Sequence, residues 1–209
     1  MSYETNVFIN CPFDDAYTDF IDAALFAVYR CNFKPRCALE INDAGDQRLD
    51  KINRIIKDCK IGIHDISRTE LDHVNNLPRF NMPLELGLFL GARKFGSSKN
   101  QKSKLAIIVD NEKYRYQKYI SDISGQDIMS HDNSPEKFIK IIKIIRDCLS
   151  SYRIVQRIPS AAIIIEDYRR FLGIKPALCA QLQLVEHELT FNDKTSIIEC
   201  YIEFYAAAA

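Results

Sequence analysis

Apolar residues in the first part of the chain follow two alternating patterns. Short continuous apolar runs bounded by turn-forming residues predict buried strands, at residues 7–10, 36–39, 61–66 and 104–109, with a short last strand after a turn at 125–127. Between them, apolar residues recur at the spacing of a helix face, which predicts helices over residues 20–28, 49–56, 82–92 and 134–150. Such alternation with short connections predicts a mostly parallel sheet with helices on both faces.

The strand pattern ends near residue 152, which sets the expected domain boundary. Residues 1–152 then form an α/β domain, a flavodoxin-like or Rossmann-like three-layer sandwich. Residues 153–205 predict a helical C-terminal extension, with breaks at 173–176, where Gly and Pro interrupt the pattern, and at 192–193. We expect this extension to serve in assembly, and we treat the alanine run 206–209 as a tail artefact.

Charge and composition narrow the classes of function. Lys plus Arg and Asp plus Glu both total 28, so the formal net charge is zero. Proteins that bind nucleic acid through phosphates usually carry a basic excess, so nucleic acid is not an expected partner. No apolar stretch has the ~20 residues that span a bilayer, and the N-terminus lacks a signal-peptide pattern. We therefore expect a cytoplasmic protein without a membrane partner.

Cysteines and histidines do not suggest a metal or a disulfide framework. The seven cysteines are odd in number, lack a CxxC pair and fall mostly in apolar segments. The four histidines have no partner at ligand spacing. We expect no metal and no bound cofactor.

One carboxylate interrupts the most apolar helix. Residues 82–92 are apolar or glycine except for Glu85, and a helix that is apolar all round is expected to be buried. Gly87 and Gly91 would let this helix approach the sheet closely. In a first turn, the helix dipole and free backbone amides stabilise negative charge. The pattern therefore allows both a simple helix-start glutamate and a functional carboxylate.

The position of Glu85 favours the functional alternative. Ligands of parallel sheets bind beyond the carboxyl ends of the strands, near a switch point in strand order. That places the candidate binding loops at residues 10–17, 40–46, 64–81 and 110–116, and the helix of Glu85 follows the third of them. The chain has no GxGxxG or P-loop motif, which argues against ordinary dinucleotide or NTP binding.

The same region resembles a known superfamily. Residues 65–67 (Asp-Ile-Ser), a loop, residues 81–87 (Asn-Met-Pro-Leu-Glu-Leu-Gly) with Gly91, and the strand at 105–109 are similar to two related groups. These are the nucleoside 2-deoxyribosyltransferases and the bacterial TIR-like domains, in which a Phe-Glu-Leu-Gly helix start carries a catalytic glutamate. The chain departs from that motif, because Pro83 and Leu84 precede Glu85. The resemblance follows the order of elements over roughly residues 5–150.

The resemblance implies cleavage of an N-glycosidic bond. Glu85 would be the catalytic carboxylate, because such a group stabilises the positive charge that develops on the ribose. Asp65 would hold a ribose hydroxyl or position Glu85, with capping of backbone amides as the alternative. Cys11 as a nucleophile is disfavoured, since no paired histidine is visible. The residues expected to bind substrate are Asn10, Cys11, Pro12, Phe13, Ser67, Arg79, Asn81 and Arg115.

The implied function is that of a nucleotide N-glycosidase. NAD or a related nucleotide would be the substrate, and the protein would act as a homo-oligomer or within a larger complex of antiviral defence. Two alternatives stay open: a nucleoside deoxyribosyltransferase or hydrolase, and a non-catalytic TIR-like module that binds a nucleotide signal or a protein.

Overall fold

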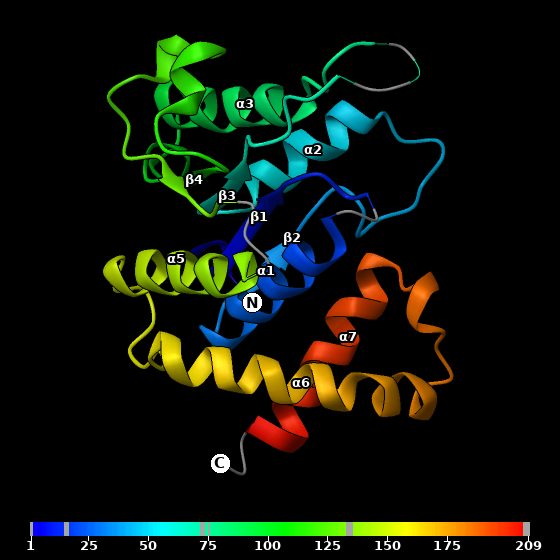
Figure 1. The fold of residues 1–209 in the computed structure, drawn as a ribbon. Coiled ribbons are helices and arrows are strands. Elements are labelled where there is room, and N and C mark those ends of the chain that lie inside the picture. Colours follow the sequence, from blue (N-terminus) through cyan, green and yellow to red (C-terminus); the bar gives the residue numbers. More distant parts are fainter. Residues whose placement is uncertain (1, 15–16, 72–73, 75, 133–135, 207–209) are drawn as a thin grey trace.

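A five-stranded, all-parallel sheet forms the centre of the molecule in the computed structural model, which describes residues 2–14, 17–71, 74, 76–132 and 136–206. The strand order is β2-β1-β3-β4-β5, and every pairing is parallel. This confirms the predicted α/β sandwich (Figure 1). The strands are β1 (Asn6–Asn10), β2 (Lys34–Arg36), β3 (Ile61–Asp65), β4 (Leu105–Asp110) and β5 (Met129–Ser130).

Helices cover both faces of the sheet (Figure 1). Val7 and Ile9 of β1 point to the face covered by α1 and α5, whereas Phe8 points to the face covered by α2 and α3. Burial of β1 and β3 on both faces explains their continuous apolar runs. The helices are α1 (Thr18–Arg30), α2 (Arg48–Lys57), α3 (Asn81–Phe95), α4 (Lys99–Lys102), α5 (Lys137–Ser151), α6 (Ala161–Gln181) and α7 (Phe191–Tyr201).

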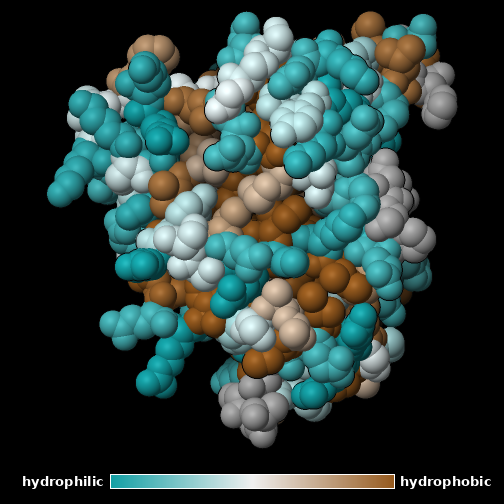
Figure 2. Space-filling model, turned by 60° about the vertical axis from the view of Figure 1, so that its left-hand side comes forward, coloured by the Kyte–Doolittle hydropathy of each residue, from teal (hydrophilic) through white to brown (hydrophobic). Residues whose placement is uncertain are grey.

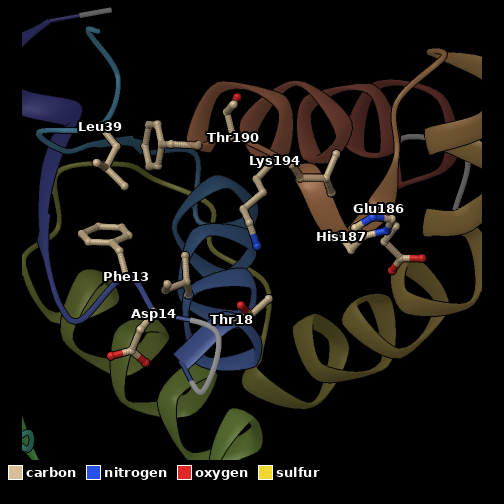
Figure 3. Close-up of a pocket in the computed structure, with 11 residues that line it drawn as sticks. Phe13, Asp14, Thr18, Leu39, Glu186, His187, Thr190 and Lys194 are labelled. Atoms are coloured by element: carbon tan, nitrogen blue, oxygen red, sulfur yellow. The ribbon is translucent and has the colours of Figure 1, made fainter. Parts of the chain in front are cut away.

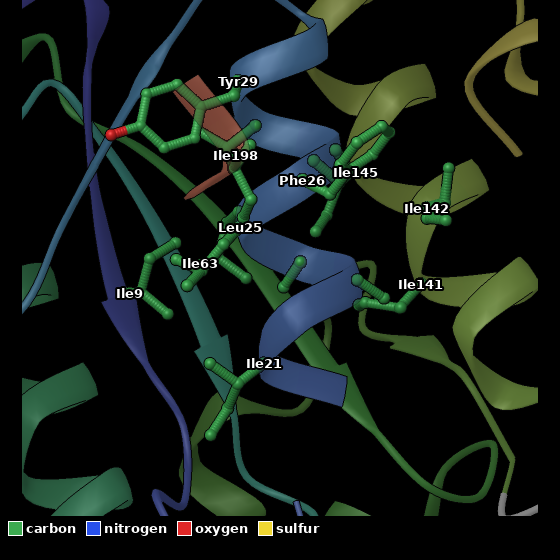
Figure 4. Close-up of a cluster of buried hydrophobic side chains, with 14 of the residues drawn as sticks. Ile9, Ile21, Leu25, Phe26, Tyr29, Ile63, Ile141, Ile142, Ile145 and Ile198 are labelled. Atoms are coloured by element: carbon green, nitrogen blue, oxygen red, sulfur yellow. The ribbon is translucent and has the colours of Figure 1, made fainter. Parts of the chain in front are cut away.

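The C-terminal helices α6 and α7 pack against α1 and extend its hydrophobic core (Figure 1). Figure 4 shows Ile198 of α7 beside Leu25, Phe26 and Tyr29 of α1. The ring of Phe26 in α1 lies 5.2 Å from that of Tyr168, 5.1 Å from that of Phe171 and 5.7 Å from that of Tyr201. Sandwiched between the sheet and these helices, α1 is buried at every residue from 20 to 29. The C-terminal extension therefore completes the core instead of lying beside it.

Both predicted breaks in the C-terminal region are wrong. The helix α6 runs through Gly173 and Pro176 because its buried face, including Phe171 and Leu178, packs on α1. A proline inside a helix costs about 3 kcal/mol, and tertiary burial offsets that cost here. The residues predicted as the second break instead start α7, where Thr190 and Asp193 form a capping box. The real break covers residues 182–190.

Some predicted boundaries also move. The second strand ends at Arg36, three residues earlier than predicted, because its register with β1 ends at the pair Phe8–Arg36. Ser134 and Pro135, which were predicted to start the helix at residues 134–150, lie outside the described residues. In the part of the chain that the structure describes, no helix has the length and apolar character to span a membrane.

The β5 edge of the sheet is short. The strand β5 pairs with Val109 and Asp110 at the end of β4. On this side of the molecule, hydrophobic residues lie open in a hollow of the surface (Figure 2). Leu105 and Ala106, at the start of β4, have no partner in β5 and are only half-buried.

Candidate active site

The carboxyl ends of β1 and β3 mark the switch point of the sheet. The chain passes from β1 to β2 on one side and returns to β3 on the other, which opens a crevice between these strand ends. Asn10 ends β1 and pairs in register with His64, next to the last residue of β3, Asp65. The loops predicted to bind a ligand therefore meet at this edge.

Asn10 fixes the start of α3 over the crevice. Its side-chain amide donates to the carbonyl oxygen of Met82 at 2.8 Å and lies 3.0 Å from Nδ1 of His64. Burial lowers the pKa of His64 to about 3, so its ring is neutral and Nδ1 accepts from Asn10. This geometry disfavours the predicted contact of Asn10 with ribose, because both amide hydrogens of Asn10 already bond to the protein.

Glu85 lies in the second turn of α3, not in the first as predicted, because the helix already begins at Asn81. Its side chain is 9% exposed. Burial raises its pKa to about 7, against a weaker opposing effect of Arg48. No hydrogen bond or ion pair from the described residues reaches its carboxylate. The free amides of a helix start do not stabilise its charge, and burial keeps part of this carboxyl protonated near neutral pH.

The hydrogen bond from Asn10 to the carbonyl oxygen of Met82 places Glu85, one turn further along α3, near the end of β1. The charge of Glu85 contributes to raising the pKa of Cys11 and of Cys37, in both cases behind the larger effect of burial. Asp65 and Asp14 act on Cys11 in the same direction. Cys11 therefore stays protonated, which agrees with its expected lack of a nucleophilic role.

The sequence predicted that this helix, α3, is buried all round, and that prediction is wrong. The helix buries only one face. Leu84 is 55% exposed, and a Cβ added to Gly87 or Gly91 would meet nothing within 4 Å. The close approach between helix and sheet comes from the strand instead. A Cβ on Gly62 would collide with His64 and lie 2.9 Å from the ring of Phe89.

Asp65 forms a buried pair with a residue that sequence analysis missed. Its Oδ1 accepts from the backbone N–H of Ser67 at 2.8 Å and lies 3.8 Å from Nε2 of His131, which follows β5. Among the described residues, neither Oδ2 of Asp65 nor Nε2 of His131 finds a hydrogen-bond partner. Burial lowers the pKa of His131, but Asp65, together with smaller contributions from Asp132 and Asp110, raises it above the ordinary histidine value. At 3.8 Å the two groups are within ion-pair distance, and they join the end of β3 to the residue that follows β5.

Arg115 connects segments of the protein around the site. Its guanidinium donates to Asp110 at 2.5 and 3.0 Å, to Thr69 at 2.6 Å and to the carbonyl oxygen of Ser67 at 2.5 Å. These bonds tie the end of β4 to the loop after β3. Ser67 also lies 2.5 Å from the hydroxyl of Tyr17. Both predicted substrate-binding residues are thus engaged with the protein.

Two arginines converge on Asp14 beside the crevice. Arg68 lies 2.9 Å and Arg79 lies 3.6 Å from its Oδ2. The guanidinium of Arg68 and the ammonium of Lys137 each lie 5.7 Å from the ring centre of Tyr17. The structure brings the predicted Arg79 to the edge of the site and adds Arg68 and Lys137, whose convergence no local pattern reveals.

Three of the other predicted residues fall at the same edge. Pro12 is buried and Phe13 is half-buried behind β1, and the exposed Asn81 starts α3.

No protein-family model and no curated protein matches this chain. The function must then be argued from the site itself. Within the described residues, no group of three or more His, Cys, Asp or Glu side chains is arranged to hold a metal ion. The chemical groups that the site offers are two buried carboxyls, Glu85 and Asp65, and a set of cations at its rim.

Proposed function

We propose that the protein is a nucleotide N-glycosidase that cleaves the bond between ribose and base in NAD or a related nucleotide, with Glu85 as the catalytic carboxylate. The observation that carries the proposal is a carboxyl group that is 9% exposed, lacks a protein partner in the described residues and lies at the switch point of a parallel sheet. A strongly shifted carboxyl at such a place is typical of a functional site.

The chemistry suits a lone carboxylate. When the bond between the ribose carbon C1′ and the pyridinium nitrogen breaks, its electron pair neutralises the nicotinamide ring, which leaves without being protonated. Positive charge develops on C1′ and the ring oxygen, and a carboxylate in a poorly solvated site stabilises it strongly. Water then adds to C1′ and releases a proton. Because the substrate is cationic at this ring, its binding would also favour the ionised form of Glu85.

Asp65 supports this proposal as a positioning residue. It is fully buried and held by Ser67 and His131, so it stabilises the loop that faces the crevice. By the resemblance to TIR-like proteins, we also propose a cytoplasmic, self-associating effector of antiviral defence.

The decisive experiment is an activity screen with the purified protein. NAD, NADP, ATP and free nucleosides are incubated separately, in dilute and concentrated protein, and the products are identified by mass. We expect nicotinamide release from the native protein and none from Glu85→Gln. Glu166→Gln is the matched control, because that carboxylate is half-exposed on the outer helix α6. If Glu85→Gln releases nicotinamide like the native protein, the proposal is wrong.

A nucleoside deoxyribosyltransferase or hydrolase is the second candidate. It is favoured by the engagement of Arg115 with Asp110, which leaves that guanidinium little capacity for a phosphate. This candidate predicts turnover of free nucleosides and no effect of Arg68→Ala on their KM. Nucleotide turnover with a raised KM in Arg68→Ala supports the leading proposal instead.

A further inference from the structure

A cavity of about 660 Å³ lies between the α/β sandwich and the C-terminal helices (Figure 3). The loop after β1, the helix α1, the turn after β2 and the segment that leads into α7 each contribute a wall. Its volume falls in the range of cavities that hold small ligands and cofactors. The wall residues that matter for the argument are Phe13, Thr18, Leu39, His187, Thr190 and Lys194.

The two ends of this cavity differ in chemistry. Phe13 and Leu39 lie together on one side, while Lys194 and His187 lie toward the other (Figure 3). A flat aromatic group fits against the apolar end, and hydroxyls of a sugar fit the polar end. Lys194 is already paired with Asp22 at 2.5 Å, so the interior of the cavity offers little net charge for an anion.

Positive charge is concentrated at the rim instead. Asp14 lines the cavity and pairs on its other side with Arg68 and Arg79. Lys137 adds a third cation near Tyr17. Two carboxylates lie near these three cations: Asp14, and Glu70, which is 3.7 Å from Arg68. They neutralise only part of the positive charge. Guanidinium groups in this position are suited to phosphate.

The cavity and Glu85 lie around the same strand ends. Leu39, in the cavity wall, donates its backbone N–H to the sulfur of Cys37 at 3.3 Å. Cys37 directly follows β2. At the end of β1, Asn10 donates to the carbonyl oxygen of Met82, one turn before Glu85 in α3, and Phe13 and Asp14 of the cavity wall follow Asn10 within four residues. A ligand long enough to reach over these ends can occupy both places.

We propose that this cavity binds the second nucleotide of a dinucleotide substrate, with its base against Phe13 and Leu39 and its phosphates at Arg68 and Arg79. The inference rests on the proposed function, since it assumes that the reacting ribose lies at Glu85. It identifies a dinucleotide as the substrate class and gives the C-terminal helices a direct part in substrate binding.

Binding of adenosine monophosphate tests the cavity without any need for catalysis. Leu39→Trp fills the apolar end, and we expect it to weaken binding at least about tenfold in calorimetry. Leu172→Trp on α6 is the control, because Leu39 and Leu172 are both 42% exposed. Thermal unfolding establishes that both variants fold. Equal binding by native protein and Leu39→Trp, or no binding by native protein, overturns the proposal.

Arg68→Ala provides a second variant that does not alter the cavity wall. We expect it to weaken binding of adenosine monophosphate severalfold and to leave binding of adenosine unchanged. Equal losses for both ligands contradict the phosphate role of the rim.

Kinetics then separate this inference from the proposed function. Leu39→Trp should raise KM for NAD and leave that for nicotinamide mononucleotide, which lacks the second nucleotide, unchanged. An unchanged KM for NAD overturns the cavity proposal while the role of Glu85 stands. Binding of adenosine monophosphate with no turnover of any nucleotide has the opposite meaning: the cavity stands and the glycosidase proposal fails.

Discussion

The folded structure disfavours the ionised form of the Glu85 carboxyl group. Its pKa rises from 4.5 to about 7 through burial, so the folded state prefers the protonated form. This preference stabilises the folded protein at low pH. The stabilisation is lost as pH rises from the pKa of Glu85 in the unfolded state to its pKa in the folded state, and it amounts to about 3 kcal/mol at most. Above pH 7 we expect Glu85→Gln to be more stable than the native protein, and near pH 4 equally stable. Urea unfolding at both pH values measures this; a loss of stability at both would reveal an ion pair.

The same pKa gives the proposed reaction a pH dependence. If Glu85 acts as a carboxylate, only its ionised form is active, and kcat/KM for NAD should rise with pH through about 7. Steady-state rates between pH 5 and 9 report this value for the free enzyme. A fall in kcat/KM across the same range would assign Glu85 the role of a general acid instead.

The pair of Asp65 and His131 is the other residue-scale feature with a measurable energy. Asp65 is completely buried and His131 is 1% exposed. Removing either charge leaves the other without compensation, which typically costs about 3 kcal/mol or more. We expect Asp65→Asn and His131→Gln to destabilise, and the double variant to lose at least about 1 kcal/mol less than the sum. Strict additivity in urea unfolding would mean that the two charges do not interact.

This stabilisation should also depend on pH. Because Asp65 raises the pKa of His131, the contribution is complete below the ordinary histidine pKa and is lost as pH rises through the raised one. Asp110 and Asp132 act on His131 in the same direction, and the ring of Phe20 packs on it from α1. The double-mutant coupling should therefore be larger at pH 6 than at pH 9.

At the scale of elements, the glycines of the helices give a direct test of packing. Gly87 and Gly91 have open space where a Cβ would stand, and alanine is favoured over glycine in a helix interior by about 1 kcal/mol. We expect Gly87→Ala and Gly91→Ala to stabilise the protein by up to that amount in thermal unfolding. Gly62→Ala should destabilise it, because its Cβ would collide with His64 and Phe89. If the helix variants destabilise instead, α3 packs against something beyond these residues.

The elements show why part of the structure follows from local sequence. The strands β1 and β3 are buried on both faces, so their apolar runs predict them without knowledge of the neighbours. The continuity of α6 depends on Phe26 in α1, far away in the chain, which packs on Phe171 and keeps the helix intact across Pro176. Local propensity alone predicts a break there.

In the candidate site, too, some features follow from local sequence and others depend on residues far apart in the chain. Glu85 is visible in the sequence because it is the one charge in an apolar segment. The partnership of Asp65 with His131, and that of Asp14 with Arg68, join segments that meet only at the sheet edge. Such pairs depend on strand order, which periodicity does not reveal.

At the scale of the whole molecule, the C-terminal helices and the sandwich form one hydrophobic core. Ile164, Tyr168 and Ile198 belong to the same cluster as Ile9 and Ile63 of the sheet. Removing the helices would expose the outer face of α1 to water. Unfolding should therefore be a single cooperative transition for the whole chain, and not two separate ones.

Buried charges fix how these helices sit on α1. Asp22, 4% exposed, accepts from Lys175 at 2.8 Å and from Lys194 at 2.5 Å, so one carboxylate joins α6 and α7 to α1. Asp22→Asn leaves two poorly solvated ammonium groups without that carboxylate, and we expect a loss of about 3 kcal/mol or more in urea unfolding. Asp19→Asn, exposed on the same helix, should cost below about 1 kcal/mol. An Asp22→Asn protein as stable as Asp19→Asn would show that apolar packing alone holds the C-terminal helices in place.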